Sequence, residues 1–321
     1  MTARLSRRRF ISVSAALAVL PSSTLATAPA ARWRGSALGA KASMSLVGVE
    51  ETAATDVFTA VQAEVARLER IFSLYRPDSA LVRLNTKGHL ESPPPELLEL
   101  ISLSDSLHRS TEGAFDPTVQ PLWQLYAARA SKGETPSARE IGEVRRRTGW
   151  TALRYDSKAV SFTREGMALT FNGIAQGYIA DKVADLLRAR GLSNVLVEMG
   201  EICALGRNAH GNAWRAGVAT PDNRIIRRLS LENRALATSA PRGTLLDAGN
   251  TVGHILDPRS GGLARTWAVV SVSAERAAMA DGLSTAFCLL PRAAIERVLP
   301  LYASASLEVL ASSENNGRDD R

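Results

Sequence analysis

The chain has 321 residues, of which 45% are hydrophobic, and its formal net charge is +7. Arg4, Arg7, Arg8 and Arg9 lie in the first 30 residues, which contain no acidic residue, so the rest of the chain has a net charge of only +3. A charge this small argues against nucleic-acid binding, which usually requires a strongly basic surface. The apolar content suffices for one large domain or for two joined lobes.

The first 30 residues have the pattern of a twin-arginine export signal. Arg7 and Arg8 precede Phe10 and a short apolar run at 11–20, an arrangement that directs export of a folded protein. The run is about half as long as a membrane-spanning helix requires, and small residues at 26–30 offer cleavage sites. We therefore expect 1–30 to be a cleaved signal and the mature protein to be periplasmic. Folded export favours a cofactor that is bound beforehand.

Cysteine and histidine usage excludes several kinds of site. The two cysteines, Cys203 and Cys288, are too few for a disulfide framework, and both lie in apolar stretches that predict buried thiols. The four histidines are not spaced as metal ligands, and the sequence contains neither a Walker loop nor a dinucleotide-binding glycine pattern. A zinc site and an ordinary Rossmann cofactor are therefore not expected.

Helical periodicity dominates the first half of the predicted mature chain. Apolar residues at spacings of three and four predict a helix over 54–72, which a proline-containing turn ends. Prolines at 93–95 predict the start of a second helix, which runs to Thr111 and is followed by a loop up to residue 118. Ser137 and Glu140 form a capping-box pattern, which predicts a short helix that closes at Gly149.

Strand patterns begin with a predicted hairpin over 151–162. A strand predicted at 168–171 leads through a glycine-bearing loop into a helix that ends at Gly191, and a strand at 195–197 follows. This order predicts a crossover unit, and the N-terminus of its helix would suit a phosphate.

The remaining sequence predicts more strands, a long helix and a polar tail. Strand-like pieces occur at 201–205, 214–218, 235–238, 254–256 and 267–273. A helix is predicted over 274–290, then a short helix and a strand at 306–310, and the tail at 313–321 is expected to be disordered. The class is therefore α+β, with a mixed sheet packed by helices in a domain that spans 31–312.

Seven separated segments together resemble the FAD:protein FMN transferases of the ApbE type. In chain order they are 35–40, 72–79 with Leu84-Asn85, 113–118, 173–178 with Asp181, 236–239, 254–261 and 279–286. Each segment alone is weak evidence, but the set in this order covers nearly all of the predicted mature chain. The resemblance implies an ApbE-like fold, related to the T-fold.

The resemblance also implies a reaction and a metal site. In this family FAD is cleaved so that FMN becomes esterified to a threonine of a partner protein and AMP leaves. Such phosphoryl transfer depends on positioning and on charge stabilisation, which a divalent cation supplies. The implied Mg²⁺ ligands are Asp281, Thr285 and the backbone carbonyl of Gly173. Taken alone, Asp281 would be interpreted as a solvated or capping residue and Thr285 as a packing residue.

For FAD itself, the positions that match the family are Leu38, Tyr75, Ala114, Phe115, Asp116, Thr170, Gln176 and Ile255. An aromatic side chain such as Tyr75 can stack on a flat ring, and Asp116 can accept hydrogen bonds from ligand hydroxyls. The structural alternative is an interhelix turn held by Tyr75 and an Asp-Pro turn at Asp116.

His254 is the candidate general base for the acceptor threonine, because imidazole titrates near neutral pH. Asp257 could orient His254 or share its role. The alternatives are a structural histidine at the start of a strand and a turn-forming aspartate before Pro258.

The chain departs from the family pattern at several positions. The family commonly has methionine at Leu38, aspartate at Thr170 and lysine at Gln176. It also often has a double glycine where this chain has Met199-Gly200-Glu201, and a glycine after Thr238-Ser239 where this chain has Ala240-Pro241. Loss of the lysine removes a positive charge beside the pyrophosphate, which would weaken FAD binding or slow transfer. A glutamine at this position resembles the NosX branch, which serves nitrous-oxide-reductase maturation. The acceptor there is a membrane-bound flavoprotein that faces the periplasm.

The sequence thus predicts a periplasmic, Mg-dependent flavin transferase, and two alternatives stay open. Water could take the place of the acceptor, so that FAD is hydrolysed to FMN and AMP. Alternatively, the chain could be a flavin carrier or assembly factor without catalytic activity. Gln176 and Thr170 keep the carrier alternative open, whereas Asp281, Thr285 and His254 argue against it.

Overall fold

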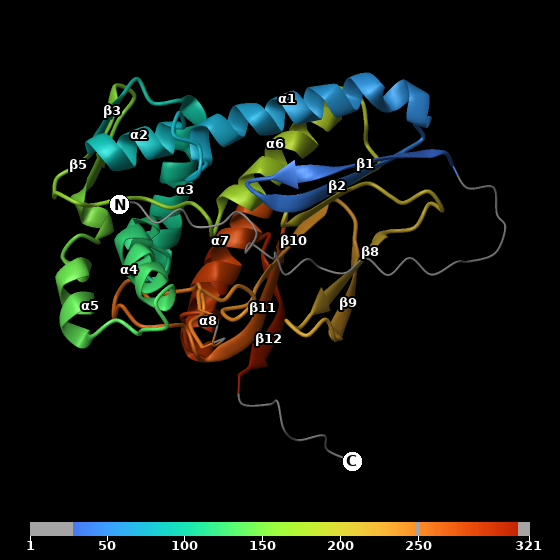
Figure 1. Cartoon of the computed structure of the whole chain (residues 1–321). Coiled ribbons are helices and arrows are strands. Elements are labelled where there is room, and N and C mark those ends of the chain that lie inside the picture. Colours follow the sequence, from blue (N-terminus) through green and yellow to red (C-terminus); the bar gives the residue numbers. More distant parts are fainter. Residues whose placement is uncertain (1–27, 248, 250, 314–321) are drawn as a thin grey trace, which may run out of the picture.

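The computed structural model describes residues 28–247, 249 and 251–313, so all but the last three residues of the predicted export signal and nearly all of the predicted tail lie outside the described residues. At the centre of the described chain is a seven-stranded sheet (Figure 1) in which every neighbouring pair is antiparallel. In spatial order its strands are β1 (Ala30–Ala37), β2 (Ala40–Val47), β6 (Val195–Glu198), β7 (Ile202–Leu205), β10 (Arg234–Ser239), β11 (Trp267–Ala274) and β12 (Ser306–Ser312).

Both faces of this sheet are buried. Successive residues of a strand point to opposite faces, so Val195 and Val197 join the main core while Leu196 joins a second core. The main core lies beneath three helices, α1 (Thr55–Phe72), α6 (Ala175–Ala189) and α7 (Ala277–Phe287). The second core lies beneath a hairpin of β8 (Trp214–Ala219) and β9 (Ile225–Leu231).

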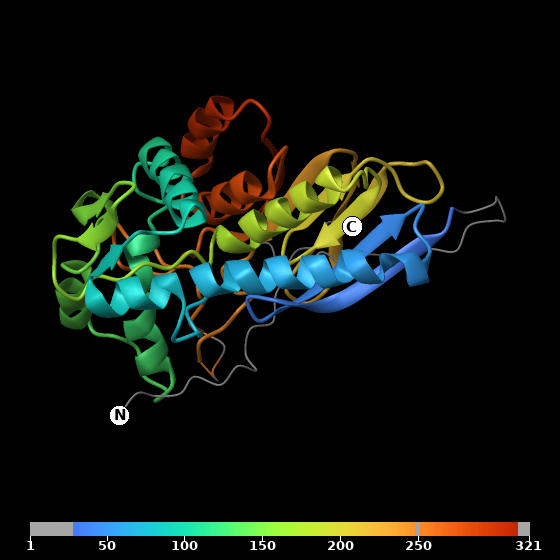
Figure 2. The ribbon, with the colours of Figure 1, turned by 90° about the horizontal axis from the view of Figure 1, so that it is seen from above.

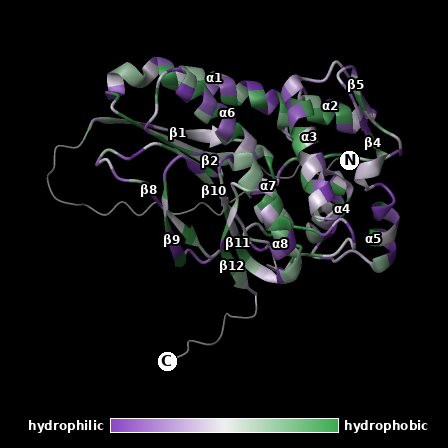
Figure 3. Cartoon of the chain, turned by 180° about the vertical axis from the view of Figure 1, so that it is seen from behind, coloured by the Kyte–Doolittle hydropathy of each residue, from purple (hydrophilic) through white to green (hydrophobic). Residues whose placement is uncertain are grey.

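The helix α1 shows how the sequence pattern places a helix on the sheet. Its buried residues Val61, Val65, Leu68 and Phe72 recur at spacings of three and four, and Figure 3 shows hydrophilic and hydrophobic residues mixed along the helix. A helix with one apolar stripe packs that stripe against the core. Figure 2 shows α1 running beside α6, which it contacts.

A group of shorter elements lies beside the main sheet, on the left in Figure 1. It contains α2 (Ala80–Lys87), α3 (Pro95–Ser110), α4 (Gln120–Ala130), α5 (Ala138–Arg145) and a small sheet of β3 (His89–Glu91), β5 (Ala159–Phe162) and β4 (Leu153–Tyr155). The last helix, α8 (Arg292–Val298), follows α7. The main core is continuous across both groups, because Leu81, Leu100 and Val160 belong to the same cluster as Val183 and Phe287.

The α+β class is confirmed, as are the helices predicted at 54–72 and 93–111, the capping box at Ser137 and the hairpin over 151–162. The helix opened by Ser137 ends at Arg145, earlier than predicted. Both cysteines are buried and free, as expected. Among the described residues, no helix has the length and apolarity needed to cross a bilayer.

The predicted strand at 168–171 and the crossover unit built on it are wrong. The backbone of Leu169 is hydrogen-bonded on both sides by the Asn85 side chain, Leu169 N to Oδ1 at 2.7 Å and Nδ2 to Leu169 O at 2.8 Å. Thr170 N donates to Pro117 O at 2.9 Å. Because a side chain and a loop satisfy this backbone, the segment has no need of a neighbouring strand.

The strand predicted at 254–256 is also absent from the described residues, which form only isolated bridges there. His254 N donates to Pro241 O, and Ile255 O accepts from Ala264 N. This segment is therefore a loop that two other loops hold in place. The main sheet, likewise, is antiparallel rather than mixed.

Candidate active site

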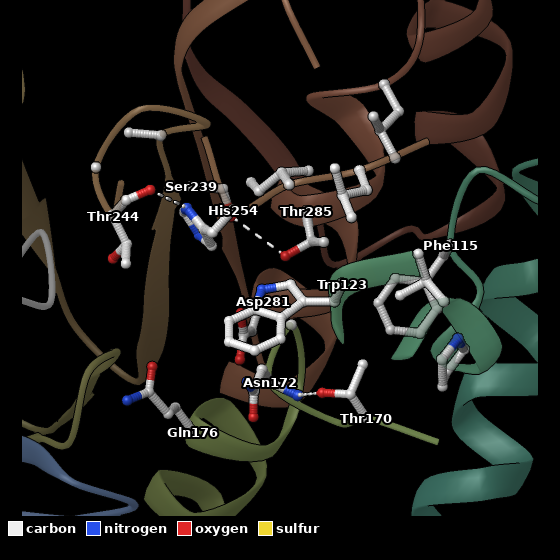
Figure 4. Close-up of a pocket in the computed structure, with 18 of the residues that line it drawn as sticks. Phe115, Trp123, Thr170, Asn172, Gln176, Ser239, Thr244, His254, Asp281 and Thr285 are labelled. Carbon is white, nitrogen blue, oxygen red and sulfur yellow. Dashed lines mark hydrogen bonds between the residues drawn. The ribbon is translucent and has the colours of Figure 1, made fainter. Parts of the chain in front are cut away.

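A pocket lies where α6 and α7 meet the group of shorter elements that contains α4 (Figure 4). It gathers every predicted site residue except Leu38, Tyr75 and Asp257. The predicted residues that line it are Ala114, Phe115, Asp116, Thr170, Gly173, Gln176, His254, Ile255, Asp281 and Thr285. They come from segments spread over more than half of the chain, so the fold itself assembles this site.

Two helices fix the floor of the pocket by capping each other. Asp281 of α7 accepts a hydrogen bond from Gly177 N in the first turn of α6, with Oδ2 and N 3.1 Å apart. In return, Asp181 of α6 accepts from Ala277 N at 2.8 Å and Ala278 N at 2.9 Å in the first turn of α7. Carboxylates at helix N-termini satisfy otherwise unpaired N–H groups and favour the helix dipole. The pair thus fixes the position of Asp281, whose carboxylate occupies the Gly177 N–H at the helix end where the sequence suggested a phosphate.

The crossing of these helices requires a glycine at position 177. A Cβ at Gly177 would lie 2.4 Å from Ala277 O, far closer than two such atoms can approach. The two backbones therefore touch at this point, and any side chain would force them apart.

The predicted metal ligands come together beside this crossing. A Cβ built on Gly173 would lie 3.0 Å from Thr285 Oγ1, so the Gly173 backbone lies directly against Thr285. Thr285 Oγ1 is 3.3 Å from Ser239 Oγ, which is 2.7 Å from Ser284 Oγ. Only one carboxylate oxygen of Asp281 is hydrogen-bonded among the described residues. The other oxygen, with the Thr285 hydroxyl, is available to a ligand.

The ionisable side chains that line the pocket are mostly acidic. Asp116, Glu201 and Asp281 line it, each no more than 8% exposed, whereas no lysine or arginine occurs among its described lining residues. Burial raises the pKa of Asp281 to about 7. It raises the pKa of Glu201 well above the usual value, and the nearby Asp281 charge adds to that effect. Burial with no lysine or arginine among the described lining residues therefore favours the neutral form of these carboxyl groups, and a bound cation would favour the ionised form.

These residues fit a hard divalent cation. No cluster of three or more His, Cys, Asp or Glu side chains suited to a metal occurs among the described residues, so a protein-only cage is absent from that part of the chain. Mg²⁺ does not need such a cage, because it binds through one or two carboxylates, other hard oxygens and substrate phosphates. Asp281, Thr285 and the Gly173 carbonyl would provide that kind of ligand set.

Asp116 forms the turn considered for it and also lines the pocket. Its Oδ1 accepts from Thr118 N at 2.8 Å and Thr118 Oγ1 at 2.7 Å, which caps the short 3-10 turn Pro117–Val119. Its Oδ2 lies 3.8 Å from His108 Nδ1, and the residue still lines the pocket. Burial raises the pKa of this carboxyl.

His254 has the geometry of a neutral base. Its Nδ1 is 3.1 Å from Thr244 O, and because a carbonyl oxygen only accepts, Nδ1 must hold the proton of the neutral ring. Nε2 then has a free lone pair. Burial lowers the pKa of His254, which favours this neutral form.

The three predicted residues outside the lining are held by other contacts. Asp257 accepts from Arg259 Nε and Nη2, both at 2.9 Å, which favours the turn role over orientation of His254. Leu38 is in the β1–β2 turn at φ 49°, and its N–H donates to Glu69 Oε1. Tyr75, 41% exposed, lies just after α1.

Gln176 lies against Gly200, which is the glycine that this chain has at the family's double-glycine position. A Cβ at Gly200 would come within 2.5 Å of the Gln176 side-chain amide, and Gly200 has φ 89°. A glycine is therefore required at position 200 both for the backbone and for the space that Gln176 fills. Thr170 Oγ1 accepts from Asn172 N at 3.2 Å.

Two lining residues, Trp123 and Glu201, were not predicted. Trp123 lies on α4, a helix that the periodicity analysis did not detect. Glu201 precedes β7, and its Oε2 accepts from Thr238 N at 3.1 Å. An acidic residue directly after Gly200, before an apolar strand, was the signal available for Glu201.

The comparisons with known proteins agree with the resemblance seen in the sequence. The sequence model of the ApbE family matches residues 38–309. An FAD:protein FMN transferase of Vibrio cholerae is 31% identical over 246 residues, which cover 72% of this chain and 73% of the relative. One from Klebsiella pneumoniae is 28% identical over 270 residues, covering 80% of this chain and 77% of the relative.

Solved structures of this kind have the same fold. The apo form of the Pseudomonas stutzeri flavinyl transferase ApbE superposes with a TM-score of 0.74 at 29% identity, covering 87% of this chain and 90% of that one. The Thermotoga maritima ApbE protein gives a TM-score of 0.77 at 25% identity, covering 89% and 97%. The chain therefore belongs to the ApbE family and has its fold.

Proposed function

We propose that this chain is an FAD:protein FMN transferase that needs Mg²⁺, attaches FMN to a threonine of a partner protein and releases AMP. Family membership and the names of the relatives support the transfer of FMN from FAD. The observation that most strongly supports the metal requirement is the acidic pocket, with three carboxylates and no lysine or arginine among its described lining residues.

A pyrophosphate would meet carboxyl groups in this pocket and no lysine or arginine among its described lining residues. Two like unit charges 4 Å apart repel by about 4 kcal/mol at an effective dielectric constant of 20, so each ionised carboxylate near the phosphates would oppose their binding. A divalent cation held by Asp281, Thr285 and the Gly173 carbonyl would reverse the local charge. When bound, it would neutralise the pyrophosphate oxygens and polarise the reacting phosphorus.

The protein residues would move the proton and position the reactants. His254 Nε2 would take the proton of the acceptor hydroxyl, while the fixed Nδ1–H···Thr244 contact holds the ring in place. The threonine oxygen forms a bond to the FMN phosphorus, the P–O bond to the bridging oxygen breaks, and that oxygen leaves with AMP. Gln176 and Asn172, at the start of α6, line the pocket and would offer polar contacts to the nucleotide.

Hydrolysis of FAD and non-catalytic flavin binding remain the alternatives, and two readouts separate them. AMP release from FAD, followed by chromatography with magnesium and with EDTA, is expected only with magnesium. A flavin carrier would release no AMP under either condition. Flavin that stays with an acceptor protein after denaturation identifies a transferase, whereas free FMN as the sole flavin product identifies a hydrolase.

The proposed setting is the periplasm, with a membrane-bound flavoprotein of nitrous-oxide-reductase maturation as acceptor. The arginine pair and short apolar run at the N-terminus support export, and Gln176 in place of the common lysine supports the NosX branch. Replacing Arg7 and Arg8 by lysine is expected to keep the protein in the cytoplasm, as fractionation would show. Periplasmic recovery of that variant would contradict the export route.

A further inference from the structure

The pocket is lined by an aromatic side chain, Trp123, to which the proposed reaction gives no role. Apart from His254, the described aromatic side chains that line the pocket are Phe115 and Trp123. Phe115 is only 4% exposed, and its backbone is fixed by Thr111 Oγ1 and His108 Nδ1. Trp123 is half-buried, and its indole projects into the pocket (Figure 4).

The indole N–H of Trp123 is free to contact a ligand. Three of the other tryptophans donate this hydrogen within the protein: Trp150 to Asp105, Trp214 to Leu205 O, and Trp267 to Leu290 O. Trp123 makes no such bond to any described residue. A buried tryptophan usually finds a partner for its N–H, and a ligand that fills the pocket and excludes water from Trp123 would supply that partner.

The helix that presents Trp123 is held rigidly. Tyr126, three residues further along α4, donates its hydroxyl to Gly261 O at 2.9 Å. Leu122 and Tyr126 pack with Val252 and Leu256 in a buried cluster. Because α4 is already fixed, the binding of a ligand that stacks on Trp123 does not carry the free-energy cost of ordering this helix.

We propose that the indole of Trp123 is the surface on which a planar ring of FAD stacks. The inference deepens the proposed function and rests on it. The sequence suggested Tyr75 for ring stacking, but Tyr75 does not line this pocket, whereas Trp123 does. FAD has two planar ring systems, the isoalloxazine and the adenine, and either presents a face that fits an indole.

The proposal predicts a change in binding that does not depend on catalysis. Stacking of a nucleobase on an aromatic side chain changes affinity by about 5- to 150-fold. Trp123→Leu keeps apolar volume but removes the ring, so FAD should bind at least about fivefold more weakly in calorimetry with magnesium. Trp123→Phe keeps a ring face and should bind FAD nearly as tightly as the wild type.

Quenching of tryptophan fluorescence by FAD tests the contact between flavin and Trp123 independently of Trp123→Leu. Flavin stacked on an indole should quench its fluorescence, so FAD should quench a share of tryptophan emission that is missing in Trp123→Phe. Trp267→Phe is the matched control, because Trp267 does not line the pocket and donates to Leu290 O. In this control the quenching should persist.

FMN and AMP distinguish the two rings. Weaker binding of FMN to Trp123→Leu assigns the isoalloxazine to Trp123, and weaker binding of AMP assigns the adenine. Either result supports the inference. Unchanged affinity for FAD, FMN and AMP, equal quenching in all variants, or an equal loss in Trp123→Phe and Trp123→Leu would overturn it. If the wild type binds none of the three, the proposed function itself fails.

Discussion

The Asp281 carboxylate accepts a hydrogen bond from the Gly177 backbone, with Oδ2 and N 3.1 Å apart. This contact joins the proposed metal ligand on α7 to the first turn of α6, where Gln176 faces the pocket. The hydrogen bonds from Ala277 and Ala278 to Asp181 complete a reciprocal cap. The position of Asp281 thus depends on the crossing of two helices as well as on its own helix.

Removing the charge of Asp281 should abolish the metal-dependent reaction. Asp281→Asn keeps an oxygen that can accept from Gly177 N but loses the negative charge that attracts a cation. We expect magnesium-dependent AMP release to fall by at least about a hundredfold, a loss of roughly 3 kcal/mol in transition-state stabilisation. Asp185→Asn, a control on the outer side of α6, should react at the wild-type rate. Normal AMP release by Asp281→Asn at saturating magnesium would remove the metal assignment.

Substitution of Gly177 should disturb the fold at the helix crossing. A Cβ in Gly177→Ala would lie 2.4 Å from Ala277 O, and such overpacking typically costs about 1–3 kcal/mol or more. Gly142→Ala is the matched control, because Gly142 is in α5 and a Cβ there meets no atom within 4 Å. That control should gain roughly 0.5–1 kcal/mol from helix propensity. Urea unfolding of both variants measures the contrast, and equal stabilities would argue against a close crossing.

Asp181 should matter for stability more than its neighbour Asp185. Asp181 is 2% exposed and accepts from two backbone N–H groups at the start of α7. Asp181→Asn can satisfy only one of them well, so we expect a loss of about 1–3 kcal/mol in the free energy of unfolding. Asp185 forms partly exposed ion pairs with Arg276 and Arg188, and Asp185→Asn should cost about 1 kcal/mol or less. A larger loss for Asp185→Asn would contradict the capping account.

His254 should determine the acidic limb of the pH–rate profile. Burial lowers the pKa of His254 below its usual 6.5, so the base should be neutral at pH 7 and transfer should decline only as the pH falls below 6.5. The same shift implies that the stability contributed by burying neutral His254 is present above pH 6.5 and is lost as the pH falls.

His254→Ala is expected to bind FAD as well as the wild type while transfer slows by about 10²- to 10⁴-fold. The measurement compares FAD affinity with the rate of AMP release over a pH series. An acidic limb with its midpoint above pH 7, or normal transfer by His254→Ala, would exclude His254 as the base.

Local patterns predicted several of the elements whose backbone bonds are local, although they missed α2 and α4. The helix α1 follows from its apolar spacing, and the helix after Ser137 from its capping box. The segment 168–171 has the composition of a strand, but its hydrogen bonds come from Asn85, which lies 84 residues from Leu169 in the chain. No local pattern contains that information, so the strand prediction failed there.

The site shows the same division. The seven segments that resemble the family indicated most of the residues that converge in the pocket, because each segment can be recognised from its own short sequence. They did not indicate Trp123, whose contribution depends on how α4 is anchored through Tyr126 to Gly261. Nor did they decide between the roles of Asp257, for which the contacts with Arg259 favour the turn.

The most direct test of the account is mass spectrometry of a threonine-bearing periplasmic flavoprotein domain after incubation with the mature protein, FAD and magnesium. The account predicts a mass gain of one FMN on a threonine of that domain, absent with EDTA and absent with Asp281→Asn. Magnesium-dependent AMP release with no flavin on the domain would contradict the transferase and indicate hydrolysis. FAD binding with neither AMP nor adduct would indicate a flavin carrier.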